Sequence, residues 1–266
     1  MWLSTITMYP VKSCHRLEFD RARVEPWGLA GDRRWMVVDT GWTMLTQRRV
    51  PAMATIRPAL TASGLVLRAP GMTDLAVDRP DGDATEVKVW LDHVMATPAG
   101  EAADVWLSTY LDRKAHLVYL DDPRRRAVNP EYAAPDDRVT FADAFPLLAT
   151  NAASLDALND WLVESGEDPV PMTRFRPNVV VSGAPPWAED GWVGRRLRIG
   201  AVPLRAVKPC DRCMVVSTDQ ETGERGRQPL LMLGHRRRLP TGLIFGVNLI
   251  PDRVGEIGIG DGVSIE

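Results

Sequence analysis

The chain has 266 residues, of which 45% are hydrophobic and 25% are charged, and its net charge at neutral pH is −3. This composition is typical of a globular protein and excludes wholesale disorder, while the balance of charges gives no sign of nucleic-acid binding. No apolar run approaches the roughly 18 residues of a membrane span, the N-terminus lacks the pattern of a secretion signal, and an odd number of cysteines argues against a secreted disulfide scaffold. We therefore expect a cytoplasmic protein without a membrane span.

Short strands dominate the elements predicted in the first part of the chain. Alternating apolar residues predict a strand over 87–91, with its odd-numbered residues buried. A helix is predicted over 101–111, and its apolar face would be formed by Ala102, Val105, Trp106 and Tyr110. The polar stretch 121–138 follows, with three consecutive arginines and several prolines. It predicts a connection between two β-rich halves, residues 1–120 and 121–266.

The second half continues with one helix and several further strands. The helix is predicted over 152–163, with Asn151 or Ser154 as its N-cap and Gly166 at its end. Strands are predicted at 179–181, in a hairpin that turns at Gly200, over 243–249 and over 257–265. Short strands with regular turn signals are typical of barrels and sandwiches. The predicted fold class is therefore mainly β with a few helices.

The segment Cys210–Asp211–Arg212–Cys213 is the sharpest local signal of chemistry. A thioredoxin-like pair should open a helix, but the following residues Met214–Val216 favour a strand. Zinc and iron–sulfur sites normally need four protein ligands, and the pattern of such a site is missing. Two interpretations stay open: two ordinary buried thiols, or one thiolate that acts as a ligand or nucleophile. Arg212 and Lys208 would favour the second by lowering the pKa of the thiol.

Three other segments carry groups that suit an anion: Lys12–Ser13, Arg33–Arg34 and Arg174–Asn178. The first follows a strand and could hold a phosphate, although a solvated lysine is the commoner case. The second follows a glycine-rich turn and could add a guanidinium fork or form a surface ion pair. In the third, alternation places Arg174, Arg176 and Asn178 on one face, which would meet either an anionic ligand or solvent.

Taken together and in this order, the segments resemble the proteins in which an N-terminal MOSC β-barrel domain precedes a MOSC domain. This group includes the mitochondrial amidoxime-reducing components and their bacterial relatives. The matching segments cover nearly the whole chain: Tyr9–Cys14, Gly31–Trp35, Thr46–Arg48, Phe141–Asp143, Arg176–Asn178, Cys210–Cys213, Thr218–Asp219 and Thr222–Gly223. The resemblance implies an N-terminal β-barrel-like domain over 1–120, a C-terminal MOSC β-barrel domain over 121–266, and a molybdenum–pterin cofactor, Mo-molybdopterin.

The resemblance also implies roles for individual residues. Cys213 matches the molybdenum ligand of the family and Asp143 an acidic residue beside the metal, so both are candidate catalytic residues. The residues that would hold the pterin or its phosphate are Lys12, Ser13, Arg33, Arg176, Asn178 and Arg212. Ala144 and Phe145 replace hydroxyl residues of some members, so a contact there would be made by the backbone. Pyridoxal phosphate binding is a further property associated with the family.

The activity implied by the resemblance is the reduction of N-hydroxylated compounds, namely amidoximes, hydroxylamines and N-hydroxylated bases. The chain shows no flavin, haem or iron–sulfur motif, so a separate electron-donor protein is expected, either a reductase or a ferredoxin- or cytochrome-like protein. One alternative is a carrier of sulfur or of molybdenum cofactor that has no turnover and uses Cys213. Another is a thiol redox protein that uses Cys210 and Cys213 as a pair.

Overall fold

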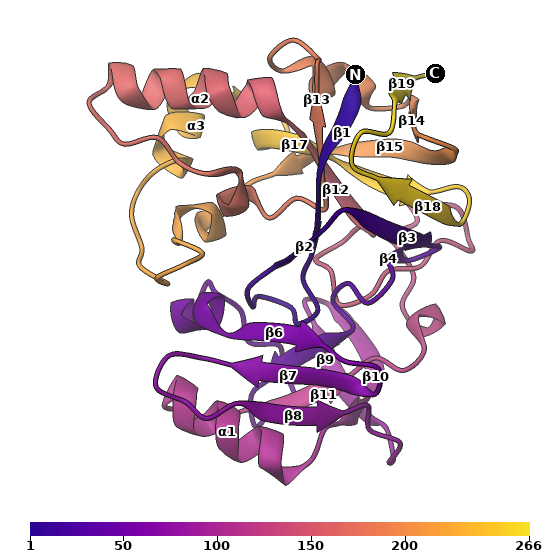
Figure 1. The fold of residues 1–266 in the computed structure, drawn as a ribbon, viewed down its shortest axis with the longest axis vertical. Helices are drawn as coiled ribbons and strands as arrows, with labels where there is room; N and C mark the ends of the chain where they lie inside the picture. Colours follow the sequence, from indigo (N-terminus) through magenta and orange to yellow (C-terminus); the bar gives the residue numbers. More distant parts are fainter.

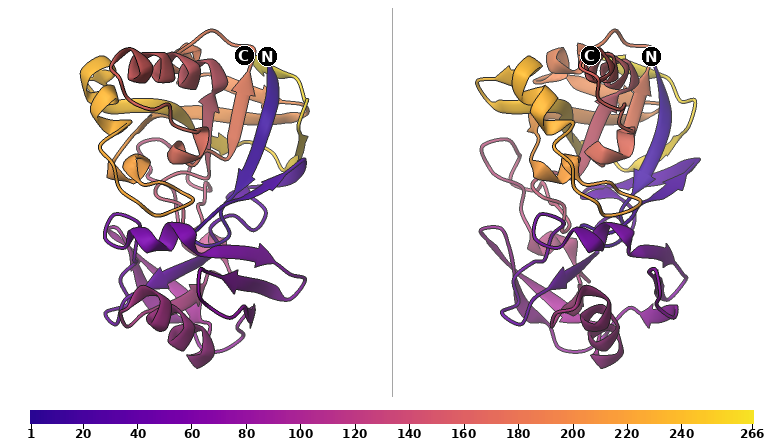
Figure 2. Two further views of the ribbon diagram at one scale, coloured as in Figure 1. Left: turned by 60° about the vertical axis from the view of Figure 1, so that its left-hand side comes forward. Right: turned by 90° about the vertical axis from the view of Figure 1, so that its left-hand side faces the viewer.

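The computed structural model describes residues 1–266, whose nineteen strands and three α-helices form two bodies, one above the other in Figure 1. The two views in Figure 2 show the same division from other sides, with several chain segments passing between the bodies. This architecture confirms the predicted fold class, mainly β with a few helices. None of the helices has the length and apolar character that a membrane crossing requires.

The upper body is built on a nine-stranded sheet. Across the sheet the strands are β19 (Val263–Ile265), β14 (Arg196–Ile199), β15 (Val202–Asp211), β17 (Gly242–Pro251), β12 (Leu147–Asn151), β13 (Val179–Ser182), β1 (Trp2–Met8) and β2 (Leu17–Phe19), with β16 (Arg238–Leu239) paired to β17. Within this sheet only the neighbours β12 and β13 run parallel. Parallel neighbours need a crossover connection, and helix α2 (Ala152–Glu164) forms part of it. Helices α2 and α3 (Leu230–Arg236) lie together beside this sheet (Figure 1).

The lower body combines two smaller sheets with one helix. The four-stranded sheet has the order β5 (Trp35–Val38), β11 (His116–Tyr119), β10 (Asp92–Pro98) and β9 (Thr85–Val89). The three-stranded sheet has the order β6 (Arg57–Leu60), β7 (Gly64–Arg68) and β8 (Leu75–Asp78). Helix α1 (Glu101–Leu111) packs against β11 and β8 and contributes to a core cluster of 17 buried residues.

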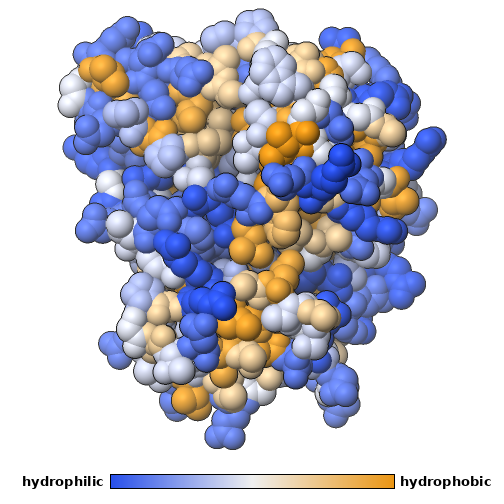
Figure 3. Space-filling model, in the orientation of Figure 1, coloured by the Kyte–Doolittle hydropathy of each residue, from blue (hydrophilic) through white to orange (hydrophobic).

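On the face of the whole molecule drawn in Figure 3, hydrophobic residues gather mainly along the middle and hydrophilic residues along the margins.

The first strands do not stay in the body of the half predicted over 1–120. Strand β1 pairs with β13 and β2 in the upper sheet, and β3 (Arg21–Glu25) pairs with β18 (Gly255–Gly258) and with β4 (Gly28–Leu29). The two termini consequently lie at the same end of the molecule (Figure 1). Because the chain starts in the upper body and then enters the lower one, the segment after β1 lies where the two bodies meet.

The local predictions are confirmed in part. Helix α1 has the predicted bounds, but its buried residues are Ala103, Trp106, Leu107 and Leu111, and Val105 is 58% exposed. The strand predicted over 87–91 ends at Val89, and Leu91 lies on the hairpin between β9 and β10 with 90% of its surface exposed. Helix α2 begins at the predicted cap, since the Asn151 side chain accepts a hydrogen bond from the Ala153 backbone N–H.

Two predictions of extended chain near the cysteine segment and Arg176 are wrong. Residues Met214–Ser217 form a 3₁₀ helix instead of a strand. Residues Met172–Phe175 form another 3₁₀ helix, after which Arg176 takes a left-handed conformation with φ of 53°. Alternation with a period of two therefore does not apply there, and Arg174 and Arg176 point to different partners.

Candidate functional site

A cleft of about 820 Å³ is lined by segments from both halves of the chain. All eight residues that the sequence predicts for the site line it: Lys12, Ser13, Arg33, Asp143, Arg176, Asn178, Arg212 and Cys213. Lys12 and Ser13 follow β1, Arg33 precedes β5, and Asp143 lies in the loop before β12. The other four lie between the 3₁₀ helix Met172–Phe175 and β13, and directly after β15. The structure thus brings together every candidate from separate parts of the sequence.

Lys12 is buried, with 3% of its surface exposed, so the interpretation as a solvated lysine is wrong. Its Nζ donates a hydrogen bond to the Phe141 carbonyl at 2.8 Å and forms an ion pair with the Asp143 carboxylate. Burial lowers the pKa of Lys12 from its ordinary 10.5 to about 8, although the Asp143 charge opposes this shift. Lys12 is therefore a cation that can lose its proton near neutral pH.

Asp143 points into the cleft with 67% of its side chain exposed. It accepts a hydrogen bond from the Trp90 indole at 3.2 Å in addition to its contact with Lys12. The walls of the cleft favour the neutral acid, but the charge and hydrogen bond of Lys12 outweigh them and hold the pKa of Asp143 below its ordinary value. The side chain is consequently an ionised hydrogen-bond acceptor at neutral pH.

Arg126 holds the loop that presents Asp143. Its guanidinium donates to the carbonyls of Thr140, Ala142 and Asp143 at 2.6, 2.5 and 3.0 Å, and its Nε donates to the Asp92 carboxylate at 2.9 Å. Only 4% of Arg126 is exposed. Sequence reasoning missed this residue because it stands in a run of three arginines within a polar connection, and nothing local distinguishes it from its neighbours.

Arg33 and Arg176 lie over the ring of one buried tyrosine, Tyr9, at 4.5 and 4.1 Å from its centroid. Arg33 Nη1 donates to the Asn178 side-chain oxygen at 3.1 Å and to Asp32 at 2.5 Å. The Asn178 amide also donates to the Thr7 carbonyl at 3.2 Å, which fixes it to β1. This part of the site is therefore a rigid cluster that spans both halves.

Two neighbouring arginines face away from this cluster. Arg34 donates to the Leu120 and Asp121 carbonyls, and Arg174 pairs with Asp219 at 3.0 Å. Neither lines the cleft. Each of the two arginine-containing segments predicted from the sequence therefore directs one arginine into the cleft, Arg33 in the first and Arg176 in the second.

Cys210 and Cys213 are free, half-buried thiols that both line the cleft. Arg212 Nη1 lies 2.8 Å from the Cys210 sulfur, and Nη2 donates to the Phe175 carbonyl at 2.5 Å. The guanidinium expected to assist Cys213 is thus held against Cys210. Arg212 Nε is buried without a hydrogen-bond partner.

Cys14, the third cysteine, has no exposed surface, and burial raises the pKa of its thiol to about 12. A thiol in this state is unreactive. It packs in the core of the lower body with residues such as Val11 and Trp35. We assign Cys14 to the packing of the core.

The cleft carries more positive than negative charge. Its lining includes seven cationic and three acidic side chains. Three of the cations are paired with carboxylates: Lys12 with Asp143, Arg33 with Asp32, and Arg126 with Asp92. The other four form no ion pair: Arg48, Arg176, Lys208 and Arg212. This distribution suits an anionic ligand.

Comparisons with known proteins assign family models to two consecutive parts of the chain. Residues 1–114 match the "MOSC N-terminal beta barrel domain" and residues 136–264 match the "MOSC domain". The human protein "Mitochondrial amidoxime-reducing component 1" is 30% identical over 283 aligned residues, which cover 99% of this chain and 82% of that protein. Its counterpart in Xenopus laevis is 29% identical, with 98% and 81% coverage. The rice "Molybdenum cofactor sulfurase" is 29% identical over 93% of this chain and 32% of its own length.

Proposed function

Because the chain belongs to the family that joins a MOSC N-terminal beta barrel domain to a MOSC domain, we propose that it is a molybdenum-dependent oxidoreductase of N-hydroxylated compounds. The substrates in this proposal are amidoximes, hydroxylamines and N-hydroxylated bases. The observation that carries it is the convergence of the Cys213 thiol, the Asp143 carboxylate and an excess of cations in one cleft. We also propose a cytoplasmic location, and we leave pyridoxal phosphate out of the proposal.

The residues of the cleft fit a molybdenum–pterin cofactor in charge and in donor type. The phosphate of the pterin is a dianion, and four of the cations in the cleft have no carboxylate partner. One of these four, Arg212, also has a buried Nε that has no hydrogen-bond partner within the fold. Because the pterin would bring sulfur ligands of its own, the chain would need to provide only one thiolate to the metal, and Cys213 is a free thiol that lines the cleft.

In this proposal each candidate has a definite task. The residues that hold the pterin and its phosphate are Lys12, Ser13, Arg33, Arg176, Asn178 and Arg212. Cys213 binds the metal, and the bound cofactor supplies two-electron reduction of the N–O bond. Asp143, as an ionised acceptor, would bind the N–H or O–H of the substrate and orient it. Reduction of the hydroxylamine to amine and water consumes two electrons and two protons, and Lys12, which lines the cleft beside Asp143, can give up a proton from Nζ.

The electrons would come from a separate protein. The sequence carries no motif for a flavin, haem or iron–sulfur centre, so the proposal includes a reductase or a ferredoxin- or cytochrome-like donor. The task of this partner is the delivery of electrons to the cleft.

The test is metal analysis joined to an assay. The chain is expressed in a host that makes the pterin, its molybdenum and pterin content per chain is measured, and benzamidoxime reduction is followed with reduced viologen dye. We expect about one molybdenum per chain and formation of benzamidine. A chain that holds molybdenum and pterin but reduces none of a panel of amidoximes and hydroxylamines contradicts the proposed activity.

A carrier of sulfur or cofactor is the second candidate, because the molybdenum cofactor sulfurases match 93% of this chain. The chain spans about a third of the length of that protein. Mass spectrometry of the untreated protein distinguishes the two functions. A persulfide on Cys213 without turnover supports the carrier, and stoichiometric molybdenum with turnover supports the enzyme.

A further inference from the structure

Two buried glutamines, one from each half of the chain, face each other beside Arg176. Gln47 Nε2 donates to Gln220 Oε1 at 3.0 Å, and Gln220 Nε2 donates back to Gln47 Oε1 at 3.0 Å. Gln47 is 0% exposed and Gln220 is 4% exposed. The remaining donors reach the Ser13 and Thr218 carbonyls. A buried polar pair of this kind is satisfied within the protein and keeps a fixed geometry.

This amide pair holds the guanidinium of Arg176. Arg176 Nη1 donates to Gln220 Oε1 at 2.8 Å, so one amide oxygen accepts from both Gln47 and Arg176. The guanidinium also lies over the Tyr9 ring at 4.1 Å. Arg176 is 9% exposed and nevertheless lines the cleft. Its orientation is thus fixed by neutral groups on two sides.

The neutrality of the amide pair sets Arg176 apart from the two first-half anchors, Lys12 and Arg33. Arg33 is paired with Asp32 and Lys12 with Asp143, so each meets a carboxylate that offsets its charge. Arg176 is held by an amide oxygen and a ring face, which orient it without cancelling its charge. A charge that is both uncompensated and largely buried interacts more strongly with an anion than a paired or solvated one.

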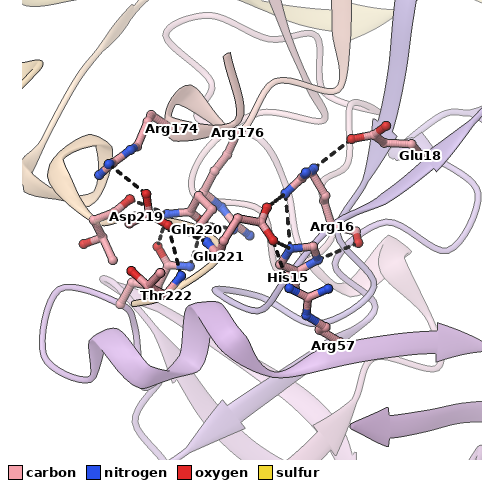
Figure 4. A network of polar contacts seen from close by, with 12 residues as sticks. His15, Arg16, Glu18, Arg57, Arg174, Arg176, Asp219, Gln220, Glu221 and Thr222 are labelled. Atoms are coloured by element: carbon pink, nitrogen blue, oxygen red, sulfur yellow. Dashed lines mark hydrogen bonds and ion pairs between the residues drawn. The ribbon is translucent and has the colours of Figure 1, made fainter. Parts of the chain in front are cut away.

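The loop that carries Gln220 is tied to the first half on one side and to its own half on the other. Glu221 accepts from His15 at 3.0 Å, from Arg16 at 2.6 Å and from Arg57 at 2.9 Å. The Asp219 carboxylate accepts hydrogen bonds from the backbone N–H groups of Glu221 and Thr222 and forms an ion pair with Arg174. Figure 4 shows Gln220 and Arg176 in the middle of these contacts. The loop therefore has little freedom to move Gln220.

We propose that Gln47 and Gln220 are positioning residues that hold Arg176 through a neutral contact, and that Arg176 in consequence contributes more than Lys12 or Arg33 to binding an anionic phosphate group in the cleft. The identity of the ligand as a pterin phosphate rests on the proposed function. The inference that Arg176 binds an anion does not depend on that function, because it follows from the residues that surround Arg176.

The experiment uses the full chain in two forms. The cofactor-free chain, from a host unable to make the pterin, is titrated with inorganic phosphate by calorimetry. The chain from a competent host is analysed for molybdenum and pterin. The informative change is Gln220→Glu, which keeps an acceptor oxygen beside Arg176 but adds a charge that cancels it. If the hydrogen bond from Arg176 to the phosphate is worth ~1.5–3 kcal/mol and is lost when its charge is cancelled, phosphate affinity falls about 10- to 150-fold.

Matched variants separate positioning from folding. Glu131→Gln, at an exposed glutamate outside the cleft, leaves the amide pair and Arg176 intact, and we expect phosphate affinity close to that of the unmodified chain. Gln220→Met removes the acceptor without adding charge and should weaken phosphate binding by a smaller factor. Arg176→Gln should weaken it more than Arg33→Gln or Lys12→Met does.

Two results would overturn the inference. One is unchanged phosphate affinity in folded Gln220→Glu, and the other is a loss in Arg33→Gln or Lys12→Met that exceeds the loss in Arg176→Gln. The arginine comparison stands even if the glutamine variants do not fold. A chain that follows the predicted order for phosphate but never contains molybdenum would contradict the proposed function and support the inference.

Discussion

Arg212 Nη1 lies 2.8 Å from the sulfur of Cys210, so the guanidinium between the two cysteines is bound to the first of them. The second, Cys213, lies at the start of the 3₁₀ helix and lines the same cleft. The Cys210 sulfur accepts a hydrogen bond that helps to orient Arg212. The Cys213 sulfur makes no hydrogen bond within the fold, so it is free to bind a metal. The two thiols are therefore expected to respond differently to mutation.

We predict that Cys213→Ala abolishes the reduction of N-hydroxylated substrates and leaves the fold intact, and that Cys210→Ala has a much milder effect. The reason is that only Cys213 has the proposed ligand role, whereas Cys210 loses one contact with Arg212. Viologen-driven turnover and circular dichroism of both variants check this. Equal loss of activity in two folded variants would favour a mechanism that uses the thiols as a pair.

Loss of a first-half anchor should weaken cofactor binding. Lys12→Ala and Arg33→Ala each remove a cation from the cleft, and a sheltered charged hydrogen bond is worth roughly 1.5–3 kcal/mol. This corresponds to about 10- to 150-fold in affinity. Both variants should purify with less molybdenum and pterin, and their melting temperatures should fall toward that of the cofactor-free chain.

The matched control for these anchors is Arg124→Ala, since the Arg124 side chain is 77% exposed and lies outside the cleft. It should change neither molybdenum content nor melting temperature. Full molybdenum occupancy in the double variant Lys12→Ala, Arg33→Ala would show that the cofactor is held by other residues. The first half would then have no part in binding it.

Anion binding should weaken as the pH rises through about 8, because burial lowers the pKa of Lys12 to about 8 and the neutral amine attracts no anion. The unfolded chain keeps this proton up to the ordinary pKa of 10.5. The stability of the cofactor-free chain therefore increases with pH between these two pKa values, since the folded state binds fewer protons there than the unfolded state. Sulfate, whose charge is constant in this range, is the probe for calorimetry. Lys12→Arg should remove the step in affinity, and an unchanged step would assign it to another group.

The sequence could predict the elements whose signals are local, such as the cap of α2 at Asn151 and the bounds of α1. It also predicted the lining of the cleft, since the family motifs mark residues that meet only in the fold. It could not predict that β1 joins the upper sheet, because strand pairing across 170 or more residues leaves no local trace. Gln220 was missed for the same reason, since Arg176 and Gln47 come from distant segments, whereas Arg126 was missed because nothing local distinguishes it from the neighbouring arginines.

Turnover should require an added electron donor. We predict no reduction of benzamidoxime by the molybdenum-loaded chain with NADH or NADPH alone, since no motif for a nicotinamide or flavin cofactor is present in the sequence. Activity should appear with reduced viologen dye or with a reductase system. Robust turnover by the purified chain with NADPH and no partner would show that the chain accepts hydride or electrons directly.

Removal of the Glu221 carboxylate should lower stability in a pH-dependent way. Partial burial would raise the pKa of Glu221, but the hydrogen bonds from Arg16 and His15 outweigh it and lower the pKa from 4.5 to about 2. A carboxylate with a lowered pKa stabilises the fold above its ordinary pKa, and this contribution is lost as the pH falls from about 4.5 to about 2. Glu221→Gln should therefore melt below the unmodified chain at neutral pH and approach it near the lower end of that range. The difference should be small and should shrink in high salt, because 47% of the side chain is exposed.

Glu131→Gln, at an exposed glutamate without an ion pair, is the control and should show no such trend. A melting difference that stays constant across the whole range would mean that packing, and not the charge of Glu221, joins this loop to the first half.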